Sequence, residues 1–256
     1  LYKNKKFKIN FDRIENFIKY NWKSFGDNLN YESIFENIYS VKPGSYLEIN
    51  EKSKLSEKFY WDPISIKINN KLKYHNEKKV LRNKFKNIMN LRLKADYPVA
   101  CLLSGGIDSS SLVSTAYSKL KKKLTCFSID PQDKDYNEKN LINKTIKKYN
   151  LKHYYVTPKK NNKYNLKIVK NLIETTGNII PTTTWLIFFY INKLIKQKKF
   201  KVILSGTGGD EFFSGYYIHH LHYLKSIMKN KKNFNKKYNE WKNYVRPFIR
   251  SKVLSD

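Results

Sequence analysis

The residues that decide the fold are 98–110, which read PVACLLSGGIDSS. The first six form a continuous apolar run, which is typical of a strand buried on both faces of a sheet. Gly105 and Gly106 then allow the backbone a tight turn, and Ile107–Leu120 has the pattern of a helix. A buried strand, a glycine-rich turn and a helix in this order predict one unit of a parallel α/β sheet.

The same alternation continues after this helix. Alternating strands and helices are joined by right-handed crossovers, and ligands bind at the carboxyl ends of the strands. We therefore predict an α/β fold, a Rossmann-like doubly wound parallel sheet with helices on both faces. The pattern places further strands at Leu124–Ile129, Lys152–Val156 and Lys201–Leu204, and helices at Asn137–Tyr149, Tyr164–Thr175 and Trp185–Lys198.

The region before this sheet has a different pattern. A helical repeat covers residues 11–20, and Ile34–Ile38 gives another short helical face. The pair Pro43 and Gly44 indicates a turn, which a strand over Ser45–Ile49 follows. We expect this region to be a segment of short helices and a strand rather than part of the sheet.

A polar linker at Asn69–Asn76 marks the boundary between two parts of the chain, and a helix running to about Lys94 follows it. We predict an inter-domain segment over residues 1–74 and the α/β domain over residues 75–256, truncated at its C-terminus. The chain begins with Leu1 rather than Met, without a signal-peptide pattern. We therefore expect it to be the middle portion of a longer protein.

The chain is strongly basic, with 51 Lys and Arg against 21 Asp and Glu and a formal net charge of +30. Apolar residues at 40% and aromatic residues at 15% indicate a folded core in spite of that charge. The basic residues are spread along the chain, as in a compositional bias toward Lys and Asn. A denser run lies at Lys225–Lys252, where Glu240 is the only acid. Such runs are usually solvated helix faces, so we do not expect nucleic acid as a partner.

Two features bear on the location of the protein. Apolar stretches such as Trp185–Ile191 are far shorter than the ~20 residues that a membrane-spanning helix needs, so we expect no membrane partner. Cys101 and Cys126 lie in predicted strands rather than in loops, which indicates free thiols rather than a disulfide framework. We therefore expect a soluble protein of the cytoplasm.

The glycine-rich turn after the first strand has the composition of an anion site. Gly105 and Gly106 let successive N–H groups point into one concavity, and the helix that follows adds unpaired N–H groups and the positive end of its dipole. Ser104, Ser109 and Ser110 add hydroxyl donors. The loop is not a Walker A motif, because the chain contains no GxxxxGK[ST] pattern. These residues predict a cradle for phosphate groups.

A second glycine-rich loop, SGTGGDE at residues 205–211, follows the last predicted strand. Loops at the carboxyl ends of parallel strands can face each other across the sheet. Asp108 in the first loop and Asp210 in the second would then offer the carboxylate oxygens that Mg²⁺ prefers between phosphates. Either aspartate alone would be explained as a charge at a helix N-terminus, whereas the two matching loops together predict a magnesium site.

The two loops resemble those of a known enzyme family. Residues 104–110 are similar to the pyrophosphate-binding loop of ATP pyrophosphatases, the PP-loop enzymes. The sequence LSGTGGDEFFSGY at 204–216 resembles the glutamine-hydrolysing asparagine synthetases. Weaker matches to that family are VKPG at 41–44, YWD at 60–62, FSI at 127–129 and YNE at 136–138.

The resemblance implies a fold of the ATP-pyrophosphatase type and a carbon–nitrogen ligase like asparagine synthase (glutamine-hydrolysing). In that family a carboxylate, with aspartate as the first expectation, attacks the α-phosphate of ATP and releases pyrophosphate. Ammonia from glutamine then displaces AMP from the acyl-adenylate. ATP and Mg²⁺ are the implied cofactors, and a small-molecule carboxylate is the implied substrate. The ammonia would come from a glutaminase domain that is missing here.

The resemblance also assigns roles to individual residues. It places adenine and ribose against Leu103, Ile129 and Gly206, and it includes Ser205 in the ATP site. The metal would be held by Asp108 and Asp210. The pyrophosphate would be held by Ser104, Gly105, Gly106, Ser109 and Ser110, and the implied catalytic residues are Thr207, Asp210 and Glu211.

Thr207 departs from the family, whose members carry a glutamate at this position. A threonine hydroxyl cannot act as a general base near neutral pH. The departure leaves open a related amidotransferase that acts on another carboxylate. A tRNA-modifying enzyme with the same pyrophosphate loop is a further alternative, and a homodimer is compatible with either reading.

The remaining candidate residues are interpreted as structural. His219, His220 and His222 have no Cys or carboxylate at ligand spacing, so we expect them on the surface of a helix. The aromatic residues 188–190 are interpreted as core packing of a helix against the sheet. His153, at the start of a predicted strand, is expected to be structural.

Overall fold

The computed structural model describes residues 7–20, 31, 33–67, 74–130, 137–158 and 162–249. The chain divides into two compact units. Unit 1 comprises residues 1–85, 129–132 and 156–199, and unit 2 comprises residues 86–128, 133–155 and 200–256. The division of the chain into residues 1–74 and 75–256 stays a prediction. The start of the polar linker, at 69–73, and Tyr136 lie outside the described residues.

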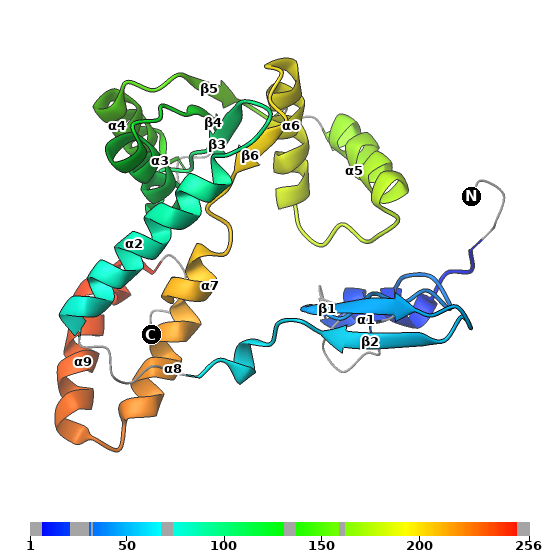
Figure 1. Ribbon diagram of the computed structural model, residues 1–256, viewed down its shortest axis with the longest axis horizontal. Helices are drawn as coiled ribbons and strands as arrows, with labels where there is room; N and C mark the ends of the chain where they lie inside the picture. Colours follow the sequence, from blue (N-terminus) through cyan, green and yellow to red (C-terminus); the bar gives the residue numbers. More distant parts are fainter. Residues whose placement is uncertain are drawn as a thin grey trace. The chain divides into compact units, whose positions relative to one another are not determined.

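A four-stranded sheet forms the centre of the fold, in the order β5-β4-β3-β6 (Figure 1). β3 pairs in parallel with both β4 and β6. The N–H of Cys126 donates to the carbonyl of Lys152 at 2.8 Å and links β4 to the chain entering β5. The strands are β3 (Val99–Leu102), β4 (Thr125–Ile129), β5 (His153–Val156) and β6 (Val202–Leu204).

The order of the strands explains where the two glycine-rich loops meet. The chain moves from β3 to β4 and on to β5, and then returns to place β6 on the other side of β3. The order therefore reverses between β3 and β6, which is the switch point where doubly wound sheets bind their ligands. The predicted doubly wound parallel sheet is confirmed, and the loops that follow β3 and β6 flank its switch point.

Two helices of unit 2, α3 (Ile107–Leu120) and α4 (Lys139–Tyr149), lie side by side (Figure 1). The rings of Tyr117 and Tyr149 pack with their centroids 5.0 Å apart, and the Tyr149 hydroxyl donates to Ser114 Oγ at 3.0 Å. The core between sheet and helices is mainly apolar, with Ser109 and Ser128 as buried polar residues. Its most buried members are Ala100, Cys101, Leu103, Val113, Ala116, Cys126 and Phe127.

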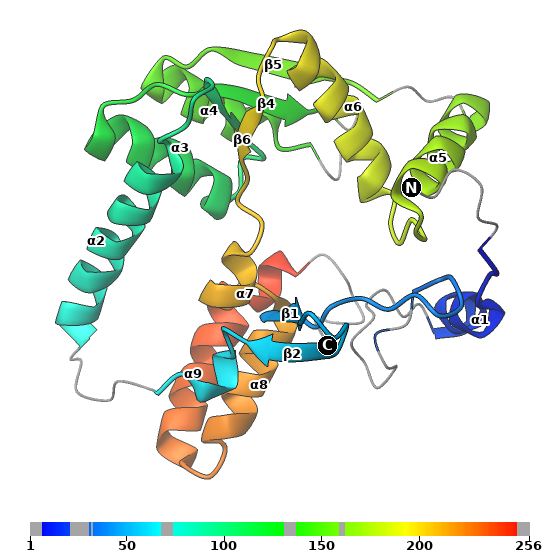
Figure 2. The same ribbon diagram turned by 45° about the vertical axis from the view of Figure 1, so that its right-hand side comes forward.

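The C-terminal part of unit 2 is helical, as the basic run and the histidines at 219–222 indicated, although the sequence analysis gave no bounds for its helices. α8 and α9 lie side by side as a hairpin (Figure 2). The Asn230 side chain caps α9 by accepting from the N–H of Asn233 at 3.1 Å. The elements are α7 (Gly209–Phe213), α8 (Tyr217–Ile227), α9 (Lys231–Tyr244) and the short helix η2 (Arg246–Phe248). No helix within the described ranges has the length and apolar character to cross a membrane.

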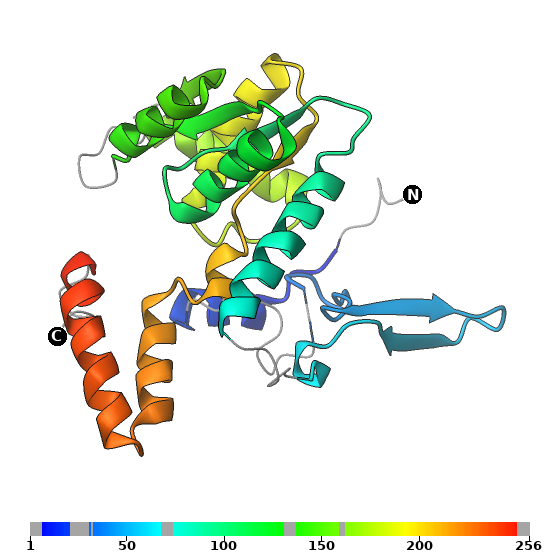
Figure 3. The same cartoon turned by 60° about the vertical axis from the view of Figure 1, so that its left-hand side comes forward.

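Unit 1 contains a two-stranded antiparallel ribbon of β1 (Ser45–Ile49) and β2 (Leu55–Phe59) (Figure 3). The strand β1 was predicted; β2 was not, because its sequence LSEKF is short and half polar. An ion pair of 3.0 Å between Lys42 Nζ and Glu57 Oε2 joins the ribbon to the preceding turn. The other elements are α1 (Phe11–Tyr20), η1 (Pro63–Ser65), α5 (Asn162–Thr176) and α6 (Thr184–Gln197), while α2 (Tyr74–Arg92) continues into unit 2.

The predicted helical face at Ile34–Ile38 is wrong. Phe35 forms an isolated antiparallel bridge with Ile9, and Asn37 adopts a left-handed backbone with φ of 60°. Both features interrupt a helix. The pairing with a residue far away in the sequence therefore overrides the local pattern.

Candidate active site

The first glycine-rich loop is shaped by close packing against α4. Gly105 has a φ of +83°, in the left-handed region that glycine adopts without strain. A Cβ at this position would lie 3.1 Å from Leu141 Cβ and 3.3 Å from Ile142 Cγ1, tighter than ordinary contact. Conformation and space therefore both require glycine at position 105.

Hydrogen bonds from serine side chains hold the same loop in place. Ser109 is almost fully buried, and its Oγ accepts from the N–H of Ser104 at 3.1 Å and contacts Ser104 Oγ at 3.0 Å. Ser104 Oγ in turn accepts from the N–H of Gly106 at 3.3 Å. The first N–H groups of α3 have no acceptor within the helix. The loop is thus internally braced beside the positive end of a helix dipole, as a phosphate site requires.

The two glycine-rich loops are in direct contact. A Cβ on Gly206 would lie 3.0 Å from Asp108 Cβ and 3.0 Å from the backbone nitrogen of Ser109. The carboxylate of Asp108 lies against Gly209, so closely that a Cβ there would overlap it. The predicted meeting of residues 104–110 with residues 205–211 is confirmed, and Asp108 is the side chain at the contact.

Asp210 lies in the first turn of α7, next to the glycine that Asp108 touches. Its own carboxylate lies against Gly215, where a Cβ would also overlap it. Among the described residues, neither Asp108 nor Asp210 forms an ion pair, in a chain with a formal charge of +30. Within the part of the chain that the structure describes, the site therefore holds two carboxylates without a basic partner.

Glu211 is hydrogen-bonded to a residue that the sequence interpretation did not select. The Tyr216 hydroxyl donates to Glu211 Oε1 at 2.7 Å. This hydrogen bond lowers the pKa of Glu211 and raises the pKa of Tyr216, which the nearby charges of Asp210 and Asp108 raise further. The sequence signal for Tyr216 was its place at the end of the stretch 204–216, which resembles the asparagine synthetases.

Thr207 is bonded within its own loop. Its Oγ1 lies 2.7 Å from Ser205 Oγ, and its N–H donates to the same Ser205 oxygen at 3.2 Å. The side chain is exposed. Thr207 is thus held by its own loop with its side chain exposed, where it can offer one hydroxyl.

The residues assigned to adenine lie where strands end. Leu103, directly after β3, is buried with 1% of its surface exposed, and Ile129 is the last residue of β4. Gly206 follows β6 and lies against the first turn of α3. The roles of these residues, and of the loop serines, stay predictions.

The three histidines of α8 were expected on the surface of a helix rather than as metal ligands. No group of three or more His, Cys, Asp or Glu side chains suited to a metal occurs in the part of the chain that the structure describes. His222 is exposed, whereas His219 Nδ1 is buried without a hydrogen-bond partner. The expectation of surface histidines is therefore correct for His222 and wrong for His219, which packs against Tyr216 at 5.2 Å.

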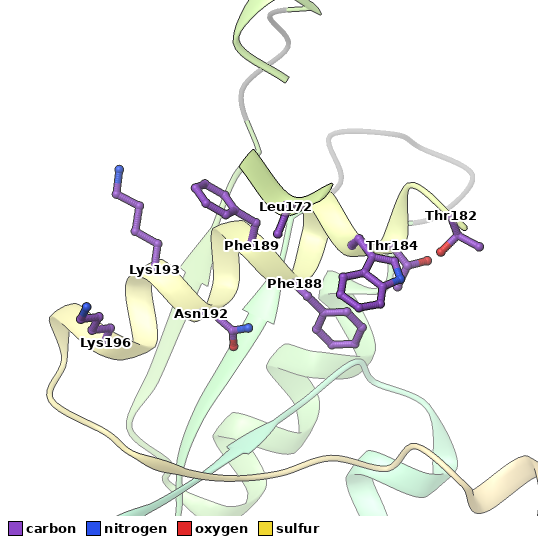
Figure 4. A pocket seen from close by; sticks show the side chains of 9 residues that line it. Leu172, Thr182, Thr184, Phe188, Phe189, Asn192, Lys193 and Lys196 are labelled. Carbon is purple, nitrogen blue, oxygen red and sulfur yellow. The ribbon is translucent and has the colours of Figure 1, made fainter. Parts of the chain in front are cut away.

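A separate pocket lies in unit 1, beside α6 (Figure 4). It has a volume of about 830 Å³, and Trp185 and Phe188 in its wall are each more than a third exposed. The expectation of core packing for residues 188–190 is therefore wrong for Phe188. Tyr190 is buried as expected and donates to Asn165 Oδ1 of α5 at 2.9 Å, whereas its packing against the sheet stays a prediction.

The donors present fit a magnesium ion. Mg²⁺ is usually bound by one or two carboxylates together with substrate phosphates, rather than by a complete protein cage. Asp108 and Asp210 supply two carboxylates that no basic side chain neutralises within the described residues. Phosphate oxygens of a substrate would complete the coordination of a metal held by these two carboxylates.

Comparison with known proteins assigns the chain to a family. The family model "Asparagine synthase" matches residues 80–253, more than half of the chain and all of both glycine-rich loops. The chain belongs to the asparagine synthase family. The resemblance seen in the loops is thereby confirmed.

Curated proteins are similar to this chain over part of their own length. It is 29% identical to a putative asparagine synthetase [glutamine-hydrolyzing] of Methanocaldococcus jannaschii, over 73% of this chain and 36% of that protein. Asparagine synthetase [glutamine-hydrolyzing] 1 of Bacillus subtilis is 28% identical over 71% of this chain and 28% of its own length. Amidase chyE of Penicillium rubens is 24% identical over 72% of this chain and 30% of its own length. The chain thus spans about a third of the length of these relatives.

Proposed function

We propose that this chain carries the nucleotide site of an ATP-dependent, amide-forming synthetase. The observation that carries the proposal is the contact of the Asp108 carboxylate with Gly209. This contact joins the phosphate-binding loop after β3 to the acidic loop after β6. Membership of the asparagine synthase family supports the same activity.

The proposed reaction has two steps. A carboxylate oxygen of the substrate attacks the α-phosphorus of ATP, the bond to the β-phosphate oxygen breaks, and pyrophosphate leaves. Ammonia then attacks the acyl carbon, the carbon–oxygen bond to AMP breaks, and the nitrogen loses a proton. In the first step, positioning and electrostatic stabilisation account for most of the catalysis.

Different residues of this chain would bind the phosphates, hold the metal and supply a carboxylate in the first step, the adenylation of the substrate. The loop N–H groups and the N-terminus of α3 would bind pyrophosphate oxygens. Asp108 and Asp210 would hold Mg²⁺, which supplies charge neutralisation to the phosphates when it is bound. Glu211 would remain ionised, because the hydrogen bond from Tyr216 lowers its pKa.

We also propose the identity of the carboxylate acceptor and of the nitrogen donor. Two of the relatives are named as glutamine-hydrolysing asparagine synthetases, which supports aspartate as acceptor and glutamine as the source of ammonia. Thr207 supports the alternative of another carboxylate, because its hydroxyl cannot serve as a general base near neutral pH. A relative named as an amidase agrees with variation of the acceptor within the family. A cytoplasmic location and a homodimer stay predictions.

The proposal is tested by replacing Asp108 with Asn. We expect the Kd of the chain for Mg·ATP, measured by calorimetry, to rise at least tenfold, because a metal ligand is lost. Asp96→Asn is the matched control: it removes the same charge from an exposed side chain before β3, at the opposite end of that strand. Equal affinity of the Asp108→Asn variant and the parent would contradict the assignment of the site.

The activity itself requires the full-length protein. Release of pyrophosphate should depend on ATP, Mg²⁺ and a carboxylic acid, with ammonia or glutamine as nitrogen donor. A panel of acids that includes aspartate identifies the acceptor. Binding of Mg·ATP without pyrophosphate release for any acid would support the nucleotide site and contradict the synthetase.

A further inference from the structure

A chain of hydrogen bonds crosses three strands directly beneath the phosphate-binding loop. His153 lies at the start of β5, Ser128 lies in β4, and Leu103 is the residue that joins β3 to the loop. His153 Nε2 lies 2.8 Å from Ser128 Oγ. The Ser128 hydroxyl also bonds to the backbone carbonyl of Leu103.

The chemistry of the groups sets the direction of these bonds. The Leu103 carbonyl can only accept, so the single hydroxyl proton of Ser128 points to it. Ser128 Oγ must then accept at its other contact, and His153 Nε2 must donate. The order is His153 N–H to Ser128 O–H to the carbonyl of Leu103, and each bond polarises the next.

The groups in this chain are removed from water. Ser128 and Leu103 have 2% and 1% of their surfaces exposed, and His153 is half-buried. Burial lowers the pKa of His153 to about 4, so the imidazole is neutral at physiological pH. The hydrogen bonds require a proton on Nε2, and a neutral imidazole meets this requirement in the tautomer that carries its proton there.

The consequence for the loop follows from the planarity of the peptide bond. The carbonyl of Leu103 and the N–H of Ser104 belong to one rigid peptide plane. Ser128 holds the carbonyl side of that plane, and Ser109 Oγ accepts from its N–H side at 3.1 Å. The plane at which the strand becomes the loop is therefore fixed from β4 on one side and from α3 on the other.

We propose that Ser128 and His153 are positioning residues of the nucleotide site, which orient the first peptide of the phosphate-binding loop through the carbonyl of Leu103. The inference rests on the proposed function for what the loop binds. Neither residue touches the phosphate loop's own N–H groups, so their effect passes through Leu103.

The proposal is tested with Ser128→Ala and His153→Leu in the full-length protein. His153→Gln is the conservative variant, because an amide N–H can still donate to Ser128. Tyr155→Phe is the matched control on β5: it removes the hydrogen bond of 3.0 Å to Asn143 Oδ1 and keeps the ring that packs 4.3 Å from His153. Two quantities are measured: amide hydrogen exchange of the peptide 103–110 without ligand, and the Kd for Mg·ATP.

In Ser128→Ala and His153→Leu we expect about tenfold faster amide exchange in the peptide 103–110 and about tenfold weaker binding of Mg·ATP. Losses of this size are typical of residues that orient the groups in direct contact with a ligand. In His153→Gln, the exchange rate of the peptide 103–110 and the Kd for Mg·ATP should both lie close to those of the parent. Tyr155→Phe should change neither the exchange rate nor the Kd. Unchanged exchange of the loop, or ATP affinity within twofold of the parent for the folded variant, would overturn the proposal. If the parent itself binds no Mg·ATP, the proposed function fails, and the exchange of the loop still decides the positioning role.

Discussion

The carboxylate of Asp108 lies against the backbone of Gly209, although 100 positions separate them in the sequence. Asp108 belongs to the first turn of α3, and Gly209 begins α7. The contact brings two helix N-termini and two carboxylates, Asp108 and Asp210, to one edge of the sheet. Among the residues that the structure describes, neither carboxylate has a basic partner, so a cation can neutralise them at this edge.

The first prediction concerns the space at Gly206. Gly206→Ala would place a Cβ 3.0 Å from Asp108 Cβ and from the backbone of Ser109, so the two loops must move apart. We expect the Kd for Mg·ATP, measured by calorimetry, to rise about tenfold or more.

Gly208→Ala separates loop contact from backbone strain in the same experiment. Gly208 has a φ of +95°, and a Cβ on it would meet nothing within 4 Å. We expect this variant to lose about 1–2 kcal/mol of stability, from the left-handed backbone, and to bind ATP normally in its folded fraction. If the Gly206→Ala variant bound Mg·ATP as tightly as the parent, the close contact of Gly206 with Asp108 and Ser109 would not be needed for binding.

The second prediction concerns the pair of Glu211 and Tyr216. The hydrogen bond of 2.7 Å lowers the pKa of Glu211, so Tyr216→Phe should let that pKa rise toward its ordinary range. Ionised Glu211 would then be lost at a higher pH, and the acid limb of the pH profile of pyrophosphate release should move to higher pH. Glu211→Gln should remove the acid limb. The double variant Glu211→Gln with Tyr216→Phe should release pyrophosphate almost as fast as Glu211→Gln alone. Unchanged pH profiles in both variants would exclude Glu211 from the reaction.

The third prediction concerns Thr207 and the acceptor. Thr207→Glu introduces the glutamate that is expected at this position in asparagine synthetases. A glutamate can accept a proton near neutral pH. If Thr207 marks a different acceptor, this variant of the full-length protein should gain aspartate-dependent pyrophosphate release of about tenfold or more. Thr207→Ser, which keeps the hydroxyl beside Ser205, should match the parent. A parent that already turns over aspartate as fast as the Thr207→Glu variant would show that threonine is simply tolerated.

The fourth prediction concerns stability below neutral pH. Burial lowers the pKa of His153 from 6.5 in the unfolded chain to about 4 in the folded one. Between these values the unfolded chain binds a proton that the folded chain does not, so stability falls as the pH drops from about 6.5 to about 4. Urea unfolding across this range should show a steeper fall in the parent than in His153→Gln. Parallel curves would contradict a depressed pKa at this position.

The fifth prediction concerns the basic residues of α9. If the charge is compositional, replacing Lys231, Lys232 and Lys236 with Gln should leave pyrophosphate release by the full-length protein within about twofold of the parent. Lys237 is kept in this variant, because its Nζ pairs with Glu240 Oε2 at 2.7 Å. A strong loss that depends on the acceptor used would instead indicate an anionic substrate or partner at this helix.

Much of the fold between Val99 and Leu204 could be predicted from the sequence. The strand–loop–helix unit at 98–120 was located correctly, with α3 observed at Ile107–Leu120 as expected. Buried strands and amphipathic helices carry their period in neighbouring residues, so local patterns suffice to find them. The two glycine-rich loops were recognisable for the same reason, since their residue types lie within seven consecutive positions.

Local patterns failed where a distant contact decides the conformation. Ile34–Ile38 has a helical spacing, yet Phe35 pairs with Ile9 and Asn37 turns the chain. The strand β2 has little apolar content of its own and exists through pairing with β1. In each case the partner, rather than the segment, supplies the hydrogen bonds that define the structure.

The sequence by itself therefore determined most of the elements between Val99 and Leu204, the two loops and the chemical types that the loops carry. The tertiary structure alone decided which of them meet: the strand order that places β6 beside β3, the contact of Asp108 with Gly209, the bond of Tyr216 to Glu211, and the link from His153 through Ser128 to Leu103. The physical reason is range. Backbone preference and hydrophobic period act over a few residues, whereas these contacts join positions that only the packing of the sheet brings together.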